Sequence, residues 1–269
     1  MTALGRTGAR ASVAVPDRQD ASISLSWGAA TDIGHRRTLN DDSYLAESPI
    51  FVVADGMGGH ASGDIASAAV VTRLAEAASG EFVQPEAIIA ALRTATADIT
   101  LAADVDARGV GTTVTGAALT LHDGSPYWAV FNIGDSRVYS FENDDLAQVT
   151  VDHSVVQELV DAGRISKDEA ERHPDSNVIT RAVGFNAEPL ADLWLIPVRQ
   201  GLRLLVCSDG LTREVSDAQL RDTLASGLSP HDTAEVLVTT ALDHGGRDNI
   251  TVVVVDVDAA PPAADDELA

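Results

Sequence analysis

Three short apolar runs in this chain each end at an aspartate. The runs cover residues 50–54, 130–134 and 204–208, and the aspartates that follow them are Asp55, Asp135 and Asp209. Asp248 stands just before a fourth apolar run, residues 250–255. Short apolar runs bounded by turn residues are typical of buried strands, so these carboxylates are expected at one rim of a sheet. Clustered anions repel one another, and Mg²⁺ or Mn²⁺ is the cation that suits such oxygen ligands.

The spacing of the apolar residues predicts many short strands and fewer, longer helices. Strands are expected near residues 22–29, 43–47, 50–54, 111–121, 126–133, 137–141, 146–149, 191–197, 202–207 and 250–257. Helices are expected over residues 62–79, 85–103, 153–162 and 230–244, with short ones opening at Ser166 and Ser216. Many strands follow one another as hairpin-like pairs, which favours an α+β fold over a doubly wound parallel sheet. We therefore expect a central β-sandwich of two antiparallel sheets flanked by helices on both sides, a four-layer αββα fold.

The chain is expected to form a single catalytic domain over residues 21–257, since no long linker or repeat interrupts it. Residues 1–20 are small, polar and proline-containing, and we expect them to be disordered. Residues 258–269 are expected to form an acidic, disordered tail.

The composition narrows the classes of partner. Eighteen Lys and Arg residues stand against 41 Asp and Glu residues, a formal net charge of −23, which argues against nucleic-acid binding and against docking on anionic lipid. The single cysteine, Cys207, excludes an intramolecular disulfide.

No apolar run approaches the roughly 18–20 residues that span a bilayer, and the N-terminus has no apolar signal segment. We expect a cytoplasmic monomer.

Two loops combine residue types that suit phosphate and metal chemistry. The loop from Arg37 to Asp42 is explained either as a solvated turn or as a site where Asp42 ligates metal and Arg37 grips a phosphate dianion. The glycine-rich segment after Asp55 lets the backbone approach a ligand, so the Gly56 carbonyl can join a metal site. It lacks the Lys-Ser/Thr of a nucleotide-binding loop. His60 is either an exposed loop residue or a general acid.

Several short motifs occur in a fixed order along the chain. They are Arg-x-x-Asn-x-Asp from Arg37, Asp-Gly-Met-Gly-Gly-His from Asp55, Gly-x-Gly-Thr-Thr from Gly109, Ile-Gly-Asp-Ser-Arg from Ile133, Ser-Asp-Gly-Leu from Ser208 and Asp-Asn-Ile-Thr from Asp248. In this order they resemble the metal-dependent Ser/Thr protein phosphatases of the PPM, or type 2C, family, and its bacterial branch best. The resemblance extends over about residues 27–257.

The resemblance implies a cleft between two sheets that binds two Mg²⁺ or Mn²⁺ ions and no organic cofactor. It assigns the two core ions to Asp42, Asp55, the Gly56 carbonyl, Asp209 and Asp248. It assigns Asp135, shared with Asp209, to a weaker third ion, and Arg37 to the substrate phosphate. Residues 150–184 resemble the mobile flap that shapes substrate access in bacterial members.

The expected activity is hydrolysis of phosphoserine and phosphothreonine in proteins, by a hydroxide that bridges two metal ions. The leaving oxygen needs a proton, which His60 or a metal-bound water supplies. The implied partners are phosphorylated proteins and the Ser/Thr kinases that the enzyme opposes in bacterial signalling. The alternatives are a pseudophosphatase that binds phosphoproteins with little turnover, and a phosphatase of partner-switching anti-sigma antagonists.

Two positions depart from the family pattern. Many members carry an aspartate four residues after the position of Asp209, where this chain has Arg213. We therefore expect the third ion to bind more weakly, or Glu214 to act on it through water. Many members also have Glu-Asp where this chain has Asp41-Asp42, and the shorter Asp41 reaches a metal-bound water less well.

Overall fold

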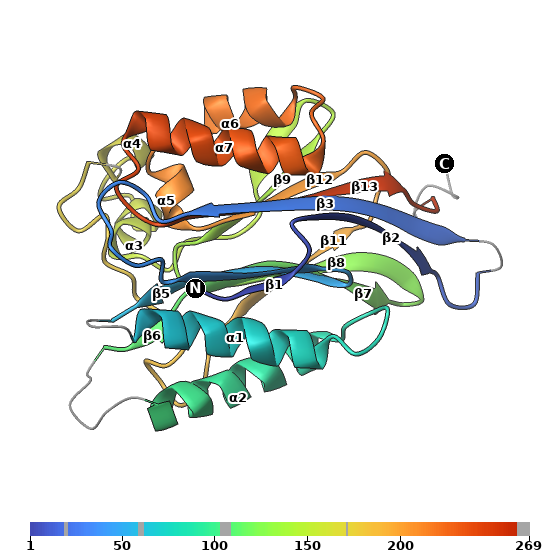
Figure 1. The fold of residues 1–269 in the computed structure, drawn as a ribbon, viewed down its shortest axis with the longest axis horizontal. Coiled ribbons are helices and arrows are strands. Elements are labelled where there is room, and N and C mark those ends of the chain that lie inside the picture. The colour runs from blue at the N-terminus through green and yellow to red at the C-terminus, as the bar shows by residue number, and fades with distance from the viewer. Residues whose placement is uncertain (19–20, 59–61, 103–108, 171, 263–269) are drawn as a thin grey trace.

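The structure is a computed structural model that describes residues 1–18, 21–58, 62–102, 109–170 and 172–262. Its strands form two packed sheets (Figure 1). The first contains β1 (Ala3–Gly5), β4 (Asp42–Glu47), β5 (Ile50–Met57), β6 (Gly111–Thr112), β7 (Val114–His122), β8 (Ser125–Ile133) and β11 (Asp192–Pro197). The order in this seven-stranded sheet is β1-β4-β5-β7-β8-β11, and β6 pairs with β5.

The second sheet has six strands in the order β10-β9-β12-β13-β3-β2. They are β2 (Gly8–Ala14), β3 (Ser22–Asp32), β9 (Arg137–Glu142), β10 (Asp145–Gln148), β12 (Arg203–Cys207) and β13 (Ile250–Ala259). All of its neighbouring strands are antiparallel. The first sheet is antiparallel as well, except that β1 runs parallel to β4 at its edge.

Helices cover the outer face of each sheet. The helices are α1 (Gly63–Ala77), α2 (Pro85–Ala102), α3 (Val155–Asp161), α4 (Lys167–Ala170), α5 (Asp209–Thr212), α6 (Asp217–Leu224) and α7 (Pro230–His244). Figure 1 shows α1 and α2 on the seven-stranded sheet and α6 and α7 on the six-stranded one. This is the four-layer αββα arrangement expected from the sequence. None of the described helices is long and apolar enough to cross a membrane.

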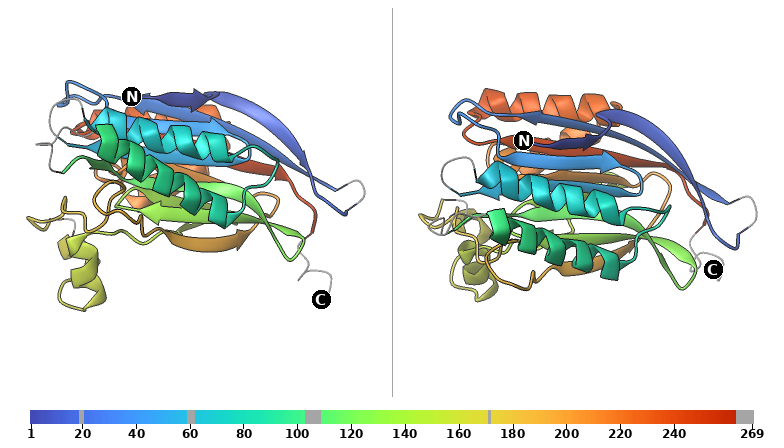
Figure 2. Two further views of the ribbon diagram at one scale, coloured as in Figure 1. Left: turned by 90° about the horizontal axis from the view of Figure 1, so that it is seen from below. Right: turned by 60° about the horizontal axis from the view of Figure 1, so that its bottom comes forward.

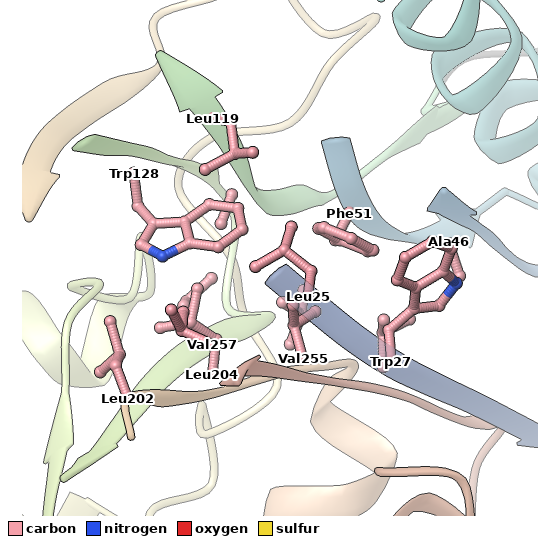
Figure 3. Packing of buried hydrophobic residues seen from close by; sticks show 14 of the residues in the cluster. Leu25, Trp27, Ala46, Phe51, Leu119, Trp128, Leu202, Leu204, Val255 and Val257 are labelled. Atoms are coloured by element: carbon pink, nitrogen blue, oxygen red, sulfur yellow. The ribbon is translucent and has the colours of Figure 1, made fainter. Parts of the chain in front are cut away.

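The two sheets are joined by a core of large side chains. Phe51 on β5 lies between Trp27 of the opposite sheet and Trp128 of its own, with ring centroids 5.4 and 6.0 Å apart in edge-to-face geometry (Figure 3). Such aromatic pairs contribute about 0.5–1.5 kcal/mol beyond burial of their area. Separate apolar clusters lie under α1 and α2 and under α5 to α7. This core therefore packs the two sheets face to face and fixes the distance between the strand ends of one sheet and those of the other.

The N-terminal segment is the main difference from the expected fold. Residues 1–20 were expected to be disordered, yet they contain β1 and β2. Ala9, Ala11 and Val13 alternate along β2 and pack on the core between the sheets, while backbone pairing with β3 supplies the hydrogen bonds. At the other end β13 runs to Ala259, two residues into the expected tail. Residues 263–269 lie outside the described residues.

Candidate metal centre

The strand ends that carry the predicted aspartates lie at one end of the sandwich, on the left of Figure 1 where α5 lies. Asp42 opens β4 and is paired across the sheet with Asp55 on β5. From the sequence positions of the strands, Asp135 lies between β8 and β9, Asp209 after β12 and Asp248 before β13. Each sheet therefore contributes strand ends to the same cluster. Asp55 is close enough to the other four for their charges to act on it.

Asp42 is fully buried. Hydrogen bonds to one of its two carboxylate oxygens hold the side chain in place. Oδ2 accepts hydrogen bonds from the Ser208 hydroxyl at 2.9 Å and from the Thr251 hydroxyl at 2.6 Å. Thr251 in turn lies 2.8 Å from the Thr31 hydroxyl, and its N–H donates to Ser208 Oγ. Oδ1 of Asp42 has no hydrogen-bond partner among the described residues. The carboxylate is thus oriented by its neighbours, with its second oxygen left for a ligand.

Buried carboxylate oxygens without partners are the observation that fits a metal ion. Asp209 repeats the pattern of Asp42, since its Oδ1 is also buried without a partner in the described part of the chain. Leaving such a group unpaired is costly, and a hard divalent cation satisfies it. Within the described ranges, no three acidic or histidine side chains yet converge on one point. Two guanidinium groups, of Arg37 and Arg213, lie against these carboxylates instead.

Gly56 is required by the close approach of two backbones. A Cβ at this position would overlap the carbonyl oxygen of Gly63, at the start of α1. The absence of a side chain therefore lets β5 continue past Asp55 directly against the helix. The assignment of the Gly56 carbonyl as a ligand stays a prediction. His60 lies outside the described residues, and its role as an acid is likewise untested.

Asp42, Asp55, Asp135 and Asp209 each have a raised pKa. Burial raises the pKa of Asp42 to about 7 and that of Asp135 to about 8. Burial, and then the Asp42 charge, raises the pKa of Asp55 well above its ordinary value. Burial also raises the pKa of Asp209, against the opposing effect of Arg213. Without added cations, several of these groups are therefore neutral near pH 7, and a metal ion must displace their protons.

These shifts predict how the metal-free protein responds to pH. Because the pKa values of about 7 and 8 exceed that of an unfolded aspartate, about 3.9, the folded protein keeps protons that the unfolded chain releases. The contribution of Asp42 and Asp135 to stability is complete below about pH 4 and is lost as pH rises through about 7 to 8. We expect the Tm to fall by on the order of 5–10 °C between about pH 6 and 8.5 in EDTA. Saturating Mn²⁺ should remove most of this dependence in scanning fluorimetry, and a Tm that stays flat in EDTA would contradict it.

Arg37 is exposed at the rim of the cluster. Its Nη2 donates to Asp248 Oδ2 at 2.7 Å, and its side chain is 53% exposed. The loop that carries it is fixed by Asn249. The Asn249 side chain accepts from the Asp41 N–H at 2.8 Å and donates to the carbonyl oxygens of Ile33 and Leu39. Arg37 is therefore placed beside the acidic cluster by a residue that the sequence analysis did not single out.

Ser208, Asn249 and Thr251 make the supporting hydrogen bonds of the candidate site, and sequence reasoning gave them no role. All three belong to motifs quoted above, in which only the acidic members were assigned a role. Residues that orient metal ligands typically change metal affinity or activity by about 10–100-fold when replaced. We expect Thr251→Val to weaken Mn²⁺ binding by about that factor, measured by calorimetry. The matched change Thr240→Val, on the exposed face of α7, should leave the affinity unchanged; equal affinities in both variants would contradict this role.

Arg213 lies against three of the carboxylates. Its guanidinium forms an ion pair with Asp209 and lies 3.4 Å from Asp135 and 3.8 Å from Asp248. Glu214, which we considered for a water-mediated role at a third ion, is directed to other partners. It accepts three hydrogen bonds from Arg247, at 2.8 to 3.0 Å.

The predicted flap is attached to the body at its base. The Arg137 guanidinium donates to both carboxylate oxygens of Asp152, and His153 exchanges two hydrogen bonds with the backbone of Gly134, next to Asp135. Beyond this base α3 has no buried residue, and Figure 2 shows it standing away from the sandwich. The base of the flap is thus connected directly to the turn that carries Asp135.

The sequence is similar to those of known protein phosphatases. A family model described as Protein phosphatase 2C matches residues 33–243. The Ser/Thr phosphatase stp of Listeria monocytogenes is 35% identical over 248 residues, spanning 87% of this chain and 97% of that protein. The Ser/Thr protein phosphatase PstP of Mycobacterium tuberculosis is 39% identical over 246 residues, spanning 88% of this chain and 46% of that longer protein.

Solved structures show the same fold. The crystal structure of M. tuberculosis PstP/Ppp superposes with a TM-score of 0.80 at 36% identity, covering 88% of this chain and all of that one. A structure of the PstP catalytic domain in complex with two manganese ions gives a TM-score of 0.78, also at 36% identity, over 88% of this chain and 99% of that one. With a family model matching most of its length and relatives above 30% identity, this chain belongs to the protein phosphatase 2C family.

Proposed function

We propose that this protein is a Mg²⁺- or Mn²⁺-dependent protein phosphatase that hydrolyses phosphoserine and phosphothreonine. One observation carries the proposal: Asp42 and Asp209, from different sheets, each keep a buried carboxylate oxygen without a partner among the described residues. The names of the relatives, Ser/Thr phosphatases, support the substrate class. The manganese in a related structure supports the metal.

Asp42, Asp55, Asp209 and Asp248, with the Gly56 carbonyl, would hold the two core ions. When bound, such a pair would supply a hydroxide nucleophile near neutral pH. The protein itself would then need no nucleophilic side chain. In agreement, burial raises the pKa of Cys207 to about 12, which keeps this nearby thiol protonated and inert.

The chain's own residues supply orientation and charge. Ser208 and Thr251 hold the Asp42 carboxylate in one orientation. Arg37 is exposed beside Asp248, and a guanidinium fork matches two oxygens of a phosphate group. Its placement at the rim would hold a phosphoserine or phosphothreonine side chain over the metal pair, with its phosphate oxygens neutralised.

The biological setting belongs to the same proposal: a cytoplasmic enzyme opposing Ser/Thr kinases. The pseudophosphatase alternative requires the loss of metal ligands, whereas Asp42, Asp55, Asp209 and Asp248 are all present. A role on partner-switching antagonists would change the substrate and not the chemistry. Rates on a phosphoserine antagonist and on an autophosphorylated kinase domain would separate these two substrate classes.

The test is phosphate release from a phosphothreonine peptide. We expect no turnover in EDTA and full recovery on adding excess Mn²⁺ or Mg²⁺. A phosphotyrosine peptide of the same sequence, assayed in parallel, should be hydrolysed much more slowly. Activity that survives EDTA would reject the metal mechanism. Tight phosphopeptide binding without turnover at saturating Mn²⁺ would favour the pseudophosphatase.

A further inference from the structure

Arg213 has an unusual position for a basic side chain. It contacts Asp209, lies 3.4 Å from Asp135 and approaches Asp248, so one guanidinium is shared by three carboxylates. Asp135 and Asp209 are both nearly buried. The orphaned Oδ1 of Asp209 is a different atom from the Oδ2 that meets Arg213. Arg213 thus neutralises one side of the cluster and leaves the other side of Asp209 for a ligand.

The backbone around Arg213 fixes this position. Arg213 follows the single turn α5, and its N–H donates to the Asp209 carbonyl oxygen at 2.9 Å. Asp209 and Arg213 are therefore neighbours on one helical face. The next residue, Glu214, is held by Arg247 immediately before Asp248. Both ends of the segment are tied to elements that carry site aspartates, so Arg213 is directed toward the cluster.

The charges of the cluster give Arg213 a specific role. A further divalent ion and the Arg213 guanidinium would compete for the same carboxylates, because Arg213 contacts Asp209 and lies 3.4 Å from Asp135. A further divalent ion at Asp135 would meet the Arg213 cation at close range.

We propose that Arg213 acts as a built-in cation at Asp135 and Asp209, taking the place that a third metal ion would fill, so that this protein binds two divalent ions and not three. The inference rests on the proposed metal-dependent function and concerns the number of ions. It assigns Asp135 to the guanidinium, in place of the weak metal site expected from the sequence. Arg213 is a positioning residue, because it touches ligands and not the substrate.

The first test counts ions in the wild-type protein. Equilibrium dialysis against a Mn²⁺ series, with metal analysis of the retained protein, should saturate at two ions per chain. Saturation at three ions would overturn the inference and leave the proposed function standing. Failure to bind Mn²⁺ would overturn both. This measurement needs no variant and no activity assay.

The second test changes Arg213. Arg213→Asp removes the cation and adds a carboxylate, and we expect its saturation to rise to three Mn²⁺ ions. Arg213→Gln should lower the Tm of the metal-free protein by about 5 °C or more, and Mn²⁺ should restore it. The control Arg73→Gln breaks an ion pair between α1 and α2 and should shift the Tm equally with and without Mn²⁺. Arg213→Asp remaining at two ions, or Arg213→Gln behaving like the control, would overturn the inference.

Discussion

The Asp209→Asn protein is expected to lose more than about 100-fold of its phosphatase activity while remaining folded. One carboxylate oxygen of Asp209 is buried without a partner among the described residues, and the other contacts Arg213. Replacing residues that only orient metal ligands already costs about 10–100-fold, so replacing a ligand itself should cost at least the upper end of this range. Asparagine has nearly the same shape, so packing is retained. Initial rates on a phosphothreonine peptide, at several Mn²⁺ concentrations, measure the loss.

The matched control is Asp222→Asn, a change of the same kind on the exposed surface of α6. It should keep wild-type activity. The Tm of each variant, measured in parallel, separates loss of function from loss of fold. Activity in Asp209→Asn within a few-fold of the wild type would contradict the assignment of this residue as a ligand.

Arg37→Ala should reduce kcat/KM by about 100-fold or more, comparable to the removal of one preorganised donor from other active sites. The guanidinium would hold the phosphate oxygens that carry charge during the reaction. Arg37→Lys should recover only part of the loss, because an ammonium group lacks the planar fork. Steady-state kinetics on the phosphothreonine peptide would give both values.

The neighbouring Arg36 provides the control, since it is also exposed on the same loop. Arg36→Ala should change kcat/KM by less than a few-fold. Because Arg37 donates to Asp248, Mn²⁺ affinity must be measured as well. If Arg37→Ala weakened Mn²⁺ binding and left kcat/KM at saturating Mn²⁺ unchanged, Arg37 would orient a ligand and not bind the phosphate.

The strands and helices with strong apolar periodicity were predictable, whereas the N-terminal strands were not. β13 consists largely of valine and α2 repeats apolar residues at helical spacing, so local composition matched the final fold. β2 is made of glycine, alanine, arginine, serine and valine, a composition that gives little strand signal by itself. It is a strand because the edge of β3 pairs with it and because the core accepts its small side chains. The formation of β2 therefore depends on β3 and the core, and not on the composition of β2 alone.

In the candidate site, too, some residues were predictable from the sequence and others only from the fold. Acidic residues at strand ends have a visible physical consequence, since their charges must be compensated, and this pattern singled out Asp55, Asp135, Asp209 and Asp248, whereas Asp42 was proposed from its loop and from the family resemblance. Thr251 and Ser208 look like ordinary polar residues until the sheets pack and bring their hydroxyls to Asp42. Arg213 was recognised as a departure from the family pattern, but only the structure places its guanidinium between carboxylates from separate loops. The aspartates were predictable from charge, and their supports depended on tertiary contacts.

We propose above that strand-end aspartates from both sheets hold a pair of divalent ions. A crystal grown with MnCl₂ and measured at the manganese absorption edge tests it directly. We predict two anomalous peaks, about 3.5–4 Å apart, each within ligating distance of carboxylates among Asp42, Asp55, Asp209 and Asp248. Peaks elsewhere on the protein, or carboxylates that bind no manganese at a saturating concentration, would show that these aspartates do not form the metal site.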